Sequence, residues 1–445
     1  MPEDLVKILG KILGDDRVLS DEISLATFSF DASNVRQMPD AVVRPTSEED
    51  VGEILQAATE HEFFVTPRGA ATSLVGGPIP VEGGVVLDLT GLNEVFELDE
   101  EEGTVEAGPG LRVKELEEKL GGDFFLPMGL AGGGSATIGG LAATDAASSL
   151  SASYGTMRNF VVGLRAVTPA GQRIDLRGYQ AGGPRFLMDS ILGSEGTLAV
   201  ITRLTIRLAR RPQAVTHSLD LLDSLDALAL LSELTARGVR PAAMDVFHRD
   251  VLEVAEGEQE AGARALVTFT GTPECIESSS KILREVLEEF KPLSHEVLEG
   301  QLPDRNEPII RAIKQAKQAA IFVSAALPRS SLRDIIPEID RTASRYRVST
   351  LTVSSVPLGW VTVGFLFNPL DDKLVGRAVS ASQSAAELFA GNGGVLGFGT
   401  GIGRTMAHAF AKHRPEAAAA FALLKKVFDP AWILNPGKIV PTRGG

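Results

Sequence analysis

A run of small residues from Leu126 to Gly171 constrains this chain more than any other feature. It contains three consecutive glycines, Gly132 to Gly134, a second pair at Gly139 and Gly140, and then a row of Ala, Ser and Thr. Glycine lets the backbone approach a ligand closely and adopt positive φ, and small hydroxyl side chains add hydrogen bonds without filling space. Because ordering so many small residues costs conformational entropy, we expect another group to pack against the run.

A flexible Gly/Ser linker is the alternative interpretation of this run. The apolar residues Ile138, Leu141 and Phe160–Val162 argue against it, because flexible linkers lack core-forming side chains. We therefore expect the run to be a structured part of a domain.

The composition is that of a globular protein with room for two or three domains. The chain has 445 residues, of which 44% are hydrophobic and 23% charged. Its formal net charge is −15. Since neutralisation of phosphates dominates nucleic-acid affinity, such an acidic chain is not expected to bind nucleic acid.

The single cysteine and the hydropathy pattern limit compartment and cofactors. Cys275 alone cannot form an internal disulfide or supply an iron–sulfur cluster, and it stands where a helix is expected to start. The N-terminus lacks the pattern of a signal peptide. No apolar run reaches the roughly 18 residues that a spanning helix needs. We expect a cytoplasmic protein without an integral membrane segment, and peripheral attachment through a partner stays open.

The first half of the chain predicts an α+β domain. Helices are expected near residues 5–13 and 112–120, and between them a third that opens at a Thr46/Glu49 capping box and runs to His61. Strands are expected near residues 42–43, 64–65, 85–89, 95–98 and 104–107, followed by a hairpin at 164–176 and a strand ending at Leu208.

The second half predicts an α/β domain with one antiparallel sheet and helices on one face. Strands are expected near residues 217–220, 265–270, 350–356 and 360–367, and helices near 224–237, 275–290, 307–319, 331–346 and 372–389. Glycines return from Gly391, before an Ala-rich helix over 413–428. The resulting domains are 1–212, 213–390 and a C-terminal segment, 391–445.

Two glycine-rich loops, near residues 67–77 and 127–140, fall in the first domain. Backbone N–H groups in such loops form concave anion sites, so two of them could close on a pyrophosphate. Neither loop has the Gly-Lys-Ser/Thr of a Walker loop or the strand, G-x-G-x-x-G and helix order of a Rossmann site. The residues therefore suggest a dinucleotide site of another kind.

Several short motifs together carry a family resemblance. They are AVVRPTSEEDV from Ala41 to Val51, Pro67-Arg68-Gly69, Thr137-Ile138-Gly139-Gly140, Tyr154-Gly155, Val162-Gly163-Leu164, Gly193-Ser194-Glu195-Gly196-Thr197-Leu198 and Asn435-Pro436-Gly437-Lys438. With them the chain resembles the FAD-binding oxidoreductases of the vanillyl-alcohol oxidase and p-cresol methylhydroxylase superfamily, in the branch of the glycolate oxidase FAD subunit and D-lactate dehydrogenase. The resemblance implies a PCMH-type FAD-binding domain of two α+β subdomains, an α/β ferredoxin-like cap for the substrate, and a C-terminal segment that returns to the flavin.

The resemblance also implies which residues bind FAD. The pyrophosphate would lie on Pro67, Arg68, Gly69, Ala70, Ala71, Thr72, Ser73 and Gly76, with Pro127, Met128, Gly129, Ser135, Thr137, Ile138, Gly139 and Gly140 extending the cradle toward the isoalloxazine. Ala143, Thr144, Ser148 and Tyr154 would line the flavin, Glu195, Gly196, Val200 and Ile201 the adenosine, and Asn435 the returning segment. A solvated turn carboxylate is the alternative for Glu195. Since the first loop has no His or Cys, we expect non-covalent FAD.

The resemblance is weakest where the reaction takes place. Relatives in this branch use histidines, some of them on a divalent metal, but the corresponding stretches here are Ser354–Val363, without His or Asp, and Gly399-Thr400-Gly401. No metal site is therefore expected. The catalytic candidates are Arg404 as an anion anchor, Lys314 where relatives have a carboxylate-binding Arg, and His408 near the glycine-rich return. Solvated helix charges are the alternative for Arg404 and Lys314, and a surface or capping histidine is the alternative that we favour for His408.

Two functions remain open. The first is an FAD-dependent dehydrogenase of a small 2-hydroxy acid, such as glycolate or D-lactate, that passes electrons to a protein partner. The second is the flavin subunit of a multi-subunit electron-transfer complex with an altered substrate site. Because relatives often hand electrons to an iron–sulfur subunit, such a partner is expected in either case. A flavin-free paralogue is disfavoured by the intact FAD loops.

Overall fold

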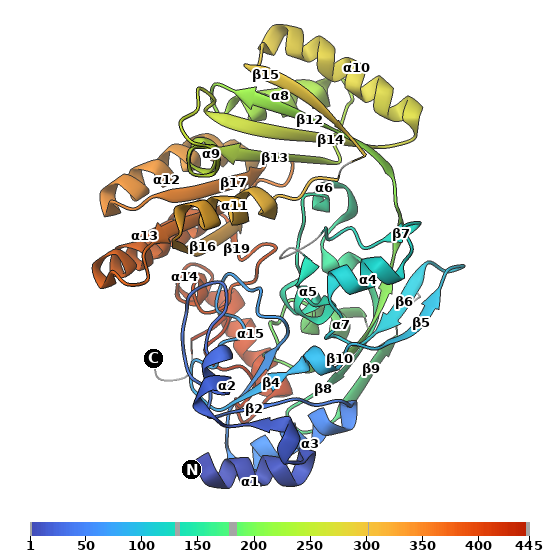
Figure 1. Cartoon of the computed structure of the whole chain (residues 1–445), viewed down its shortest axis with the longest axis vertical. Coiled ribbons are helices and arrows are strands. Elements are labelled where there is room, and N and C mark those ends of the chain that lie inside the picture. Colours follow the sequence, from blue (N-terminus) through green and yellow to red (C-terminus); the bar gives the residue numbers. More distant parts are fainter. Residues whose placement is uncertain (1, 130–133, 178–184, 301, 442–445) are drawn as a thin grey trace.

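The computed structural model describes residues 2–129, 134–177, 185–300 and 302–441, and Gly132 and Gly133 lie outside them. The N-terminal half forms the lower part of Figure 1, where both termini lie, and a sheet with its helices forms the upper part. This mixed architecture confirms the expected α+β class. Among the described residues, no helix is long and apolar enough to cross a membrane.

A four-stranded sheet in the order β1-β2-β4-β3 begins the chain. Its strands are β1 (Val18–Leu19), β2 (Ala41–Val43), β3 (Val65–Arg68) and β4 (Val85–Asp88), with helices α1 (Pro2–Leu13), α2 (Glu22–Thr27) and α3 (Glu48–His61). The cap of α3 is Ser47, whose side chain accepts from the backbone N–H of Asp50. The Thr46/Glu49 capping box was therefore wrong: Thr46 instead donates its own N–H to the Asp50 carboxylate.

A five-stranded antiparallel sheet in the order β5-β6-β10-β8-β9 follows. Its strands are β5 (Val95–Asp99), β6 (Thr104–Ala107), β8 (Val161–Val167), β9 (Arg173–Arg177) and β10 (Val200–Arg207); β7 (Phe124–Phe125) pairs with β11 (Ala209–Arg210). The helices are α4 (Val113–Lys119), α5 (Ile138–Thr144), α6 (Ser151–Tyr154) and α7 (Arg185–Ile191). Ile138 and Leu141 of the small-residue run lie in this core, so the run is not a linker.

One antiparallel sheet of eight strands forms the upper half, as expected. Its order is β15-β12-β14-β13-β17-β18-β16-β19, and the strands are β12 (Gln213–Leu221), β13 (Ala243–His248), β14 (Ala263–Gly271), β15 (Ser294–Glu299), β16 (Ala319–Ala326), β17 (Thr350–Ser355), β18 (Trp360–Phe367) and β19 (Val395–Leu396). Strands β13, β15, β16 and β19 were not expected. The central strands β13 and β16 are buried on both faces and do not alternate between apolar and polar residues. Strand β15 is instead an exposed edge strand, and β19 has only two residues.

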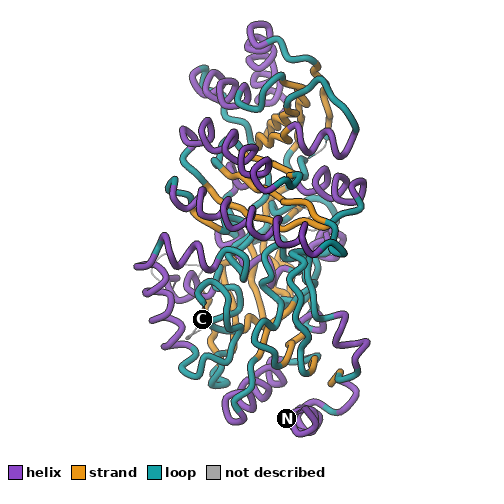
Figure 2. Tube along the Cα trace, turned by 90° about the vertical axis from the view of Figure 1, so that its left-hand side faces the viewer, coloured by secondary structure: helices purple, strands orange, loops and turns teal. Residues whose placement is uncertain are grey.

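Helices cover both faces of this sheet, so the expectation of one covered face was wrong. Helices α8 (Asp226–Ala236), α10 (Pro273–Phe290), α12 (Leu332–Tyr346) and α13 (Asp372–Gly391) share one core with the sheet, and α9 (Arg249–Glu256) and α11 (Asn306–Ala316) share a second core with it. On β16, Val323 packs into the first core and its neighbour Phe322 into the second, as the alternation of side chains along a strand requires. Figure 2 shows strands of this half between helices.

The last segment returns to the lower half through two helices, α14 (Ala407–His413) and α15 (Pro415–Phe428). The single helix expected over 413–428 is thus one of two, and Pro415 occupies the first turn of the second, a position that proline tolerates because no N–H is needed there. After α15, Asn435 donates its backbone N–H to the carbonyl of Val65 beside the first glycine loop.

Candidate functional site

The two glycine-rich loops touch each other. A Cβ atom on Gly69 would lie 2.4 Å from Oγ1 of Thr137, which is closer than any real side chain allows. Gly139 is equally close to another segment, since a Cβ there would lie 2.4 Å from Cβ of Pro109. Glycine is therefore required where these backbones approach. The first loop therefore lies against Thr137 of the second loop at the end of β3, which agrees with the dinucleotide hypothesis.

The first loop is organised by Ser73. Its hydroxyl accepts hydrogen bonds from the backbone N–H groups of Val75 and Gly77, and Ala71 and Gly76 have positive φ. Arg68, in contrast, turns away from the loop. Its buried guanidinium donates to carbonyls of residues 27–30 and stacks on Phe28 at 5.2 Å, so this side chain holds the N-terminal segment.

Hydroxyl groups of the second loop shape the backbone. Thr137 caps α5 by accepting from the N–H of Gly140, and Ser148 donates to the carbonyl of Pro127 at 2.8 Å. Thr144 donates to the carbonyl of Gly140. Tyr154 lies edge-on to Phe125 rather than in the loop. These side chains set the course of the backbone, and the N–H groups of Ile138 and Gly139 are bonded to the carbonyls of Leu111 and Pro109.

Glu195 joins three distant segments. Its buried carboxylate accepts from the N–H of Ile402 at 2.6 Å and of Gly403 at 2.8 Å. Its backbone carbonyl accepts from the Asn435 side chain at 2.8 Å, and that side chain also reaches the carbonyl of Gly77. The solvated turn carboxylate is therefore excluded for Glu195.

A buried cation, Lys438, faces the same cluster. Its ammonium donates to the carbonyl of Ile79 at 2.6 Å. Burial raises the pKa of Glu195 to about 7 against the opposing effect of the N–H groups of Ile402 and Gly403. Burial also lowers the pKa of Lys438 to about 7, although the nearby Glu195 favours its charged form. Both groups therefore change charge easily near neutral pH.

The remaining expected cofactor residues frame these loops. The N–H of Glu195 donates to the carbonyl of Ala143 at 2.7 Å, and a Cβ on Gly196 would contact Pro67. Met128, Val200 and Ile201 are buried, Gly129 has positive φ, Ser135 is exposed, and Ala70 and Thr72 are half-buried in the first loop.

The cluster fits a large polar ligand. Several buried polar atoms around the loops lack a hydrogen-bond partner among the described residues: Ser149 Oγ, Ser194 Oγ, Thr405 Oγ1 and Asn435 Oδ1. Native proteins rarely leave such atoms unpaired. With the glycine surface of the two loops, they are what an extended ligand carrying phosphates and hydrogen-bonding rings requires.

The upper sheet meets the small-residue run at Trp360. A Cβ on Gly399 would lie 2.8 Å both from Cβ of Ala147 and from the Trp360 ring. The indole N–H donates to Ser324 Oγ at 2.7 Å, and Phe398 stands edge-on to the ring. Gly399 was singled out because Glu-His-Gly is absent there. The structure shows instead that the backbone at Gly399 lies between Ala147 of the lower half and Trp360 of the upper half.

A buried ion pair lies beside Trp360. The Arg305 guanidinium stacks 3.4 Å from the Trp360 ring, and its Nη1 lies 3.9 Å from Oδ1 of Asp245. Arg305 is 3% exposed and Asp245 0% exposed. Burial lowers the pKa of Arg305 to about 10, and Asp245 and Asp304 partly oppose that shift. Sequence reasoning missed Arg305, which stands in a polar turn, and passed over Asp245, although a carboxylate inside the apolar strand Ala243–His248 was a usable signal.

The three catalytic candidates lie elsewhere. Arg404 is exposed beside Gly76 and Gly437, at the cofactor loops. Lys314 is exposed on α11, and His408 is exposed on α14. His248 is buried and bonds Ser354. Within the described ranges, no group of three His, Cys, Asp or Glu could hold a metal ion.

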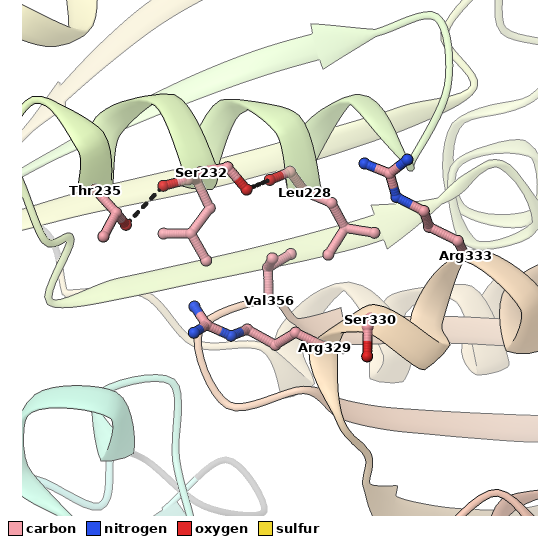
Figure 3. A pocket seen from close by; sticks show the side chains of 8 residues that line it. Leu228, Ser232, Thr235, Arg329, Ser330, Arg333 and Val356 are labelled. Carbon is pink, nitrogen blue, oxygen red and sulfur yellow. Dashed lines mark hydrogen bonds between the residues drawn. The ribbon is translucent and has the colours of Figure 1, made fainter.

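A separate cavity of about 430 Å³ lies on the other face of the upper sheet. Figure 3 shows it between α8 and the start of α12, with Arg329 and Arg333 on its rim and Val356 at its floor. Val356 packs into the core that the sheet shares with α8 and α12. The preceding residue, Ser355, lies opposite Asp245 in the sheet, and both point to the other face. This cavity is therefore distinct from the Trp360 site.

Comparison with known proteins places this architecture in a family. A family model described as FAD binding domain matches residues 39–177. A second model, described as FAD linked oxidases, C-terminal domain, matches residues 211–439 and by itself covers more than half of the chain. The chain belongs to the FAD-linked oxidases. It is an oxidoreductase, and its cofactor is FAD.

Individual relatives cover nearly the whole chain. D-lactate dehydrogenase of Archaeoglobus fulgidus is 30% identical over 90% of this chain and 91% of its own length. Glycolate oxidase subunit GlcD of Bacillus subtilis is 26% identical over 98% and 97%. The solved structure of p-cresol methylhydroxylase with substrate bound has a TM-score of 0.82 at 14% identity, covering 100% of this chain and 97% of that one. At that identity the structural match shows the fold alone.

Proposed function

We propose that this protein is an FAD-dependent dehydrogenase of a small 2-hydroxy acid, such as glycolate or D-lactate, and that it passes the electrons to a protein partner. The names of the relatives support this class of substrate. The observation that carries the proposal is Arg305. It is a buried cation with unused N–H donors, beside the contact between the upper sheet and the small-residue run.

FAD is proposed to bind non-covalently along the two glycine loops and below Trp360. It would be held by the two loops together with Glu195 and Asn435. Positive charge near its diphosphate would come from Arg404 and Lys438. When bound, FAD supplies the oxidant, because its ring accepts two electrons and a hydrogen from carbon. We propose a division at residue 212, since the strands up to β11 and those from β12 on belong to different sheets. The C-terminal segment from residue 391 is proposed as a third part, although its strand β19 still pairs with β16 of the upper sheet.

Arg305 is proposed to bind the substrate carboxylate. A guanidinium offers five N–H donors in a planar fork that suits a carboxylate, and stacking on Trp360 fixes its plane. A buried cation holds an anion more strongly than an exposed one, since screening by water is absent. The burial therefore favours Arg305 over the exposed Lys314 for this role, and the position of Arg404 favours the cofactor.

Anaerobic reduction tests the proposal. The purified yellow protein is mixed without oxygen with glycolate, D-lactate, L-lactate or D-2-hydroxyglutarate, and the visible flavin absorbance is followed. We expect at least one acid to bleach it and Arg305→Lys to raise the KM, whereas Lys314→Met should not. Absence of bleaching with every acid contradicts the proposal. Release of free FAD by acid checks non-covalent binding.

The partner is proposed to be an iron–sulfur subunit. A relative is named a subunit, and this chain has a single, exposed cysteine, Cys275, so it cannot carry a cluster alone. The alternative of a flavin subunit with an altered substrate site shares this partner. Co-purification from the native host followed by iron analysis tests it, and a chain isolated without any iron-containing protein argues against it.

A further inference from the structure

Asp245, Ser355 and Trp360 form a row across three neighbouring strands. In the register of the sheet, Asp245 of β13 is opposite Ser355 of β17, and Ser355 is opposite Trp360 of β18. Directly opposed residues of antiparallel strands point to the same face. Phe247 is two residues from Asp245, Val353 is two residues from Ser355, and both pack into the core formed with α9 and α11. Residues two apart on a strand point to the same face, so the row lies on the face of the sheet that α9 and α11 cover.

The row ends at the small-residue run. Trp360 lies against Gly399 and Ala147, and Ser149 is close enough to Asp245 to favour its ionised form and lower its pKa. Helix α6, which follows Ser149, packs against β13, where Ser153 donates to the carbonyl of Ala242. Asp245 therefore faces the part of the chain that is proposed to carry the flavin.

The carboxylate of Asp245 has unused bonding capacity. Among the described residues, Ser149 and Arg305 are its polar neighbours, but neither forms a well-aligned hydrogen bond with it, and Nη1 of Arg305 lies 3.9 Å away. Oγ of Ser355 and Nη1 of Arg305 likewise have no hydrogen-bond partner there. A buried carboxylate without donors is costly. Three polar groups with unused bonding capacity in one place indicate that a polar ligand completes their bonding.

The charges around Asp245 suit a proton acceptor. Arg305 favours its ionised form, while burial and the neighbouring Asp304 raise its pKa. A carboxylate whose pKa is raised, although a cation lies beside it, is a stronger base than a carboxylate in water. None of the six histidines takes this place: His248 points to the opposite face of β13, and the other five lie on other elements.

We propose that Asp245 is the catalytic base of this enzyme, accepting the hydroxyl proton of a 2-hydroxy acid whose carboxylate is held by Arg305. The inference rests on the proposed function. The O–H bond breaks and its proton goes to Asp245. The C2–H bond breaks and its hydrogen leaves with two electrons to the flavin. A C=O bond forms at C2, so a 2-oxo acid is the product. Ser355 is placed to orient the hydroxyl.

A purely structural ion pair would behave differently. Loss of one partner would then lower the unfolding temperature, as for other buried pairs, without changing how the reduction rate depends on pH. A base, in contrast, must be ionised in the complex with substrate, so the rate of flavin reduction falls as the pH drops through its pKa. Loss of this acid limb in a variant without the carboxylate therefore separates the two roles.

The test uses the FAD-loaded protein and two measurements. Anaerobic bleaching by the best acid is followed from pH 5 to pH 9. Oxalate, which cannot be oxidised here, is titrated by calorimetry to show that each variant still binds an anion. The variants are Asp245→Asn, Asp245→Glu, which keeps the carboxylate if the first does not fold, and Glu307→Gln, an exposed carboxylate of α11, as control.

We expect the acid limb in the wild type, Asp245→Glu and Glu307→Gln, and its loss in Asp245→Asn, which should still bind oxalate. Bleaching should slow at least about 100-fold in Asp245→Asn, the range of general-base catalysis, and stay near wild type in Glu307→Gln. An Asp245→Asn protein that bleaches at the wild-type rate, or that keeps the wild-type acid limb, overturns the inference alone. If Asp245→Asn does not fold, Asp245→Glu decides: an unchanged rate and pH profile overturn it. A wild type that no acid bleaches overturns the proposed function and this inference with it.

Discussion

The carboxylate of Glu195 accepts a hydrogen bond from the backbone N–H of Gly403, 208 residues further along the chain, at 2.8 Å. The same carboxylate accepts the N–H of Ile402. Through these bonds one side chain of the FAD-binding half fixes the glycine-rich return that precedes α14. The return in turn places Gly399 between Ala147 and Trp360. Cofactor loops and upper sheet are therefore coupled through Glu195.

Glu195→Gln should destabilise the protein. An amide has one acceptor oxygen, so one of the two backbone N–H groups loses its partner, at a cost of about 1–3 kcal/mol. Thermal unfolding and the fraction of FAD retained after gel filtration measure the effect, with the exposed Glu260→Gln as control. Equal unfolding temperatures for the two variants would contradict the role given to Glu195.

The pH dependence of stability should also change in Glu195→Gln. The pKa of Glu195 is raised from 4.5 to about 7 in the folded protein. Between those values Glu195 holds more protons in the folded state than in the unfolded state, so its contribution to the free energy of unfolding falls as pH rises and levels off above about 7. Urea unfolding at pH 5, 6 and 7 should show this slope in the wild type and a smaller one in the variant. Parallel curves for both proteins would count against a raised pKa.

Gly69→Ala should force the two glycine loops apart, because its Cβ would meet Thr137. We expect weaker FAD retention and a lower unfolding temperature. Since glycine is an acceptable cap at a cost of a few tenths of a kcal/mol (about 0.3), Thr137→Gly in the same protein should restore both. Gly376→Ala is the control. It lies in α13 with open space around it and should gain about 0.5–1 kcal/mol. A double variant as poor as Gly69→Ala would refute the contact.

Lys425→Met should loosen the C-terminal segment. Its buried ammonium donates to the carbonyls of Thr197 and Leu434 and to Asp429, all within 2.7 Å. Removing it leaves a buried carboxylate without its cation, which costs about 3–5 kcal/mol. Thermal unfolding compares it with Lys426→Met, the exposed neighbour on α15. A loss below about 1 kcal/mol, the value of a surface pair, would show that Lys425 is dispensable.

The sequence by itself determined the local features of this protein. Glycine positions that need close approach, such as Gly69 and Gly139, and the hairpin of β8 and β9 follow from residue type alone, and they led to the FAD loops. Helices with clear apolar periodicity, such as α10, were also predictable. These features depend on the size of single residues and on their spacing along the chain, which one sequence is enough to show.

Only the tertiary structure decided the rest. The side of the sheet that Asp245 faces depends on strand register, and the meeting of Arg305 with Trp360 joins residues that no periodicity connects. Strands such as β16, buried on both faces, have no alternating pattern to reveal them. The same holds for Glu195, whose partners lie more than two hundred residues away. Burial and long-range pairing, not residue type, gave these side chains their charge states and contacts.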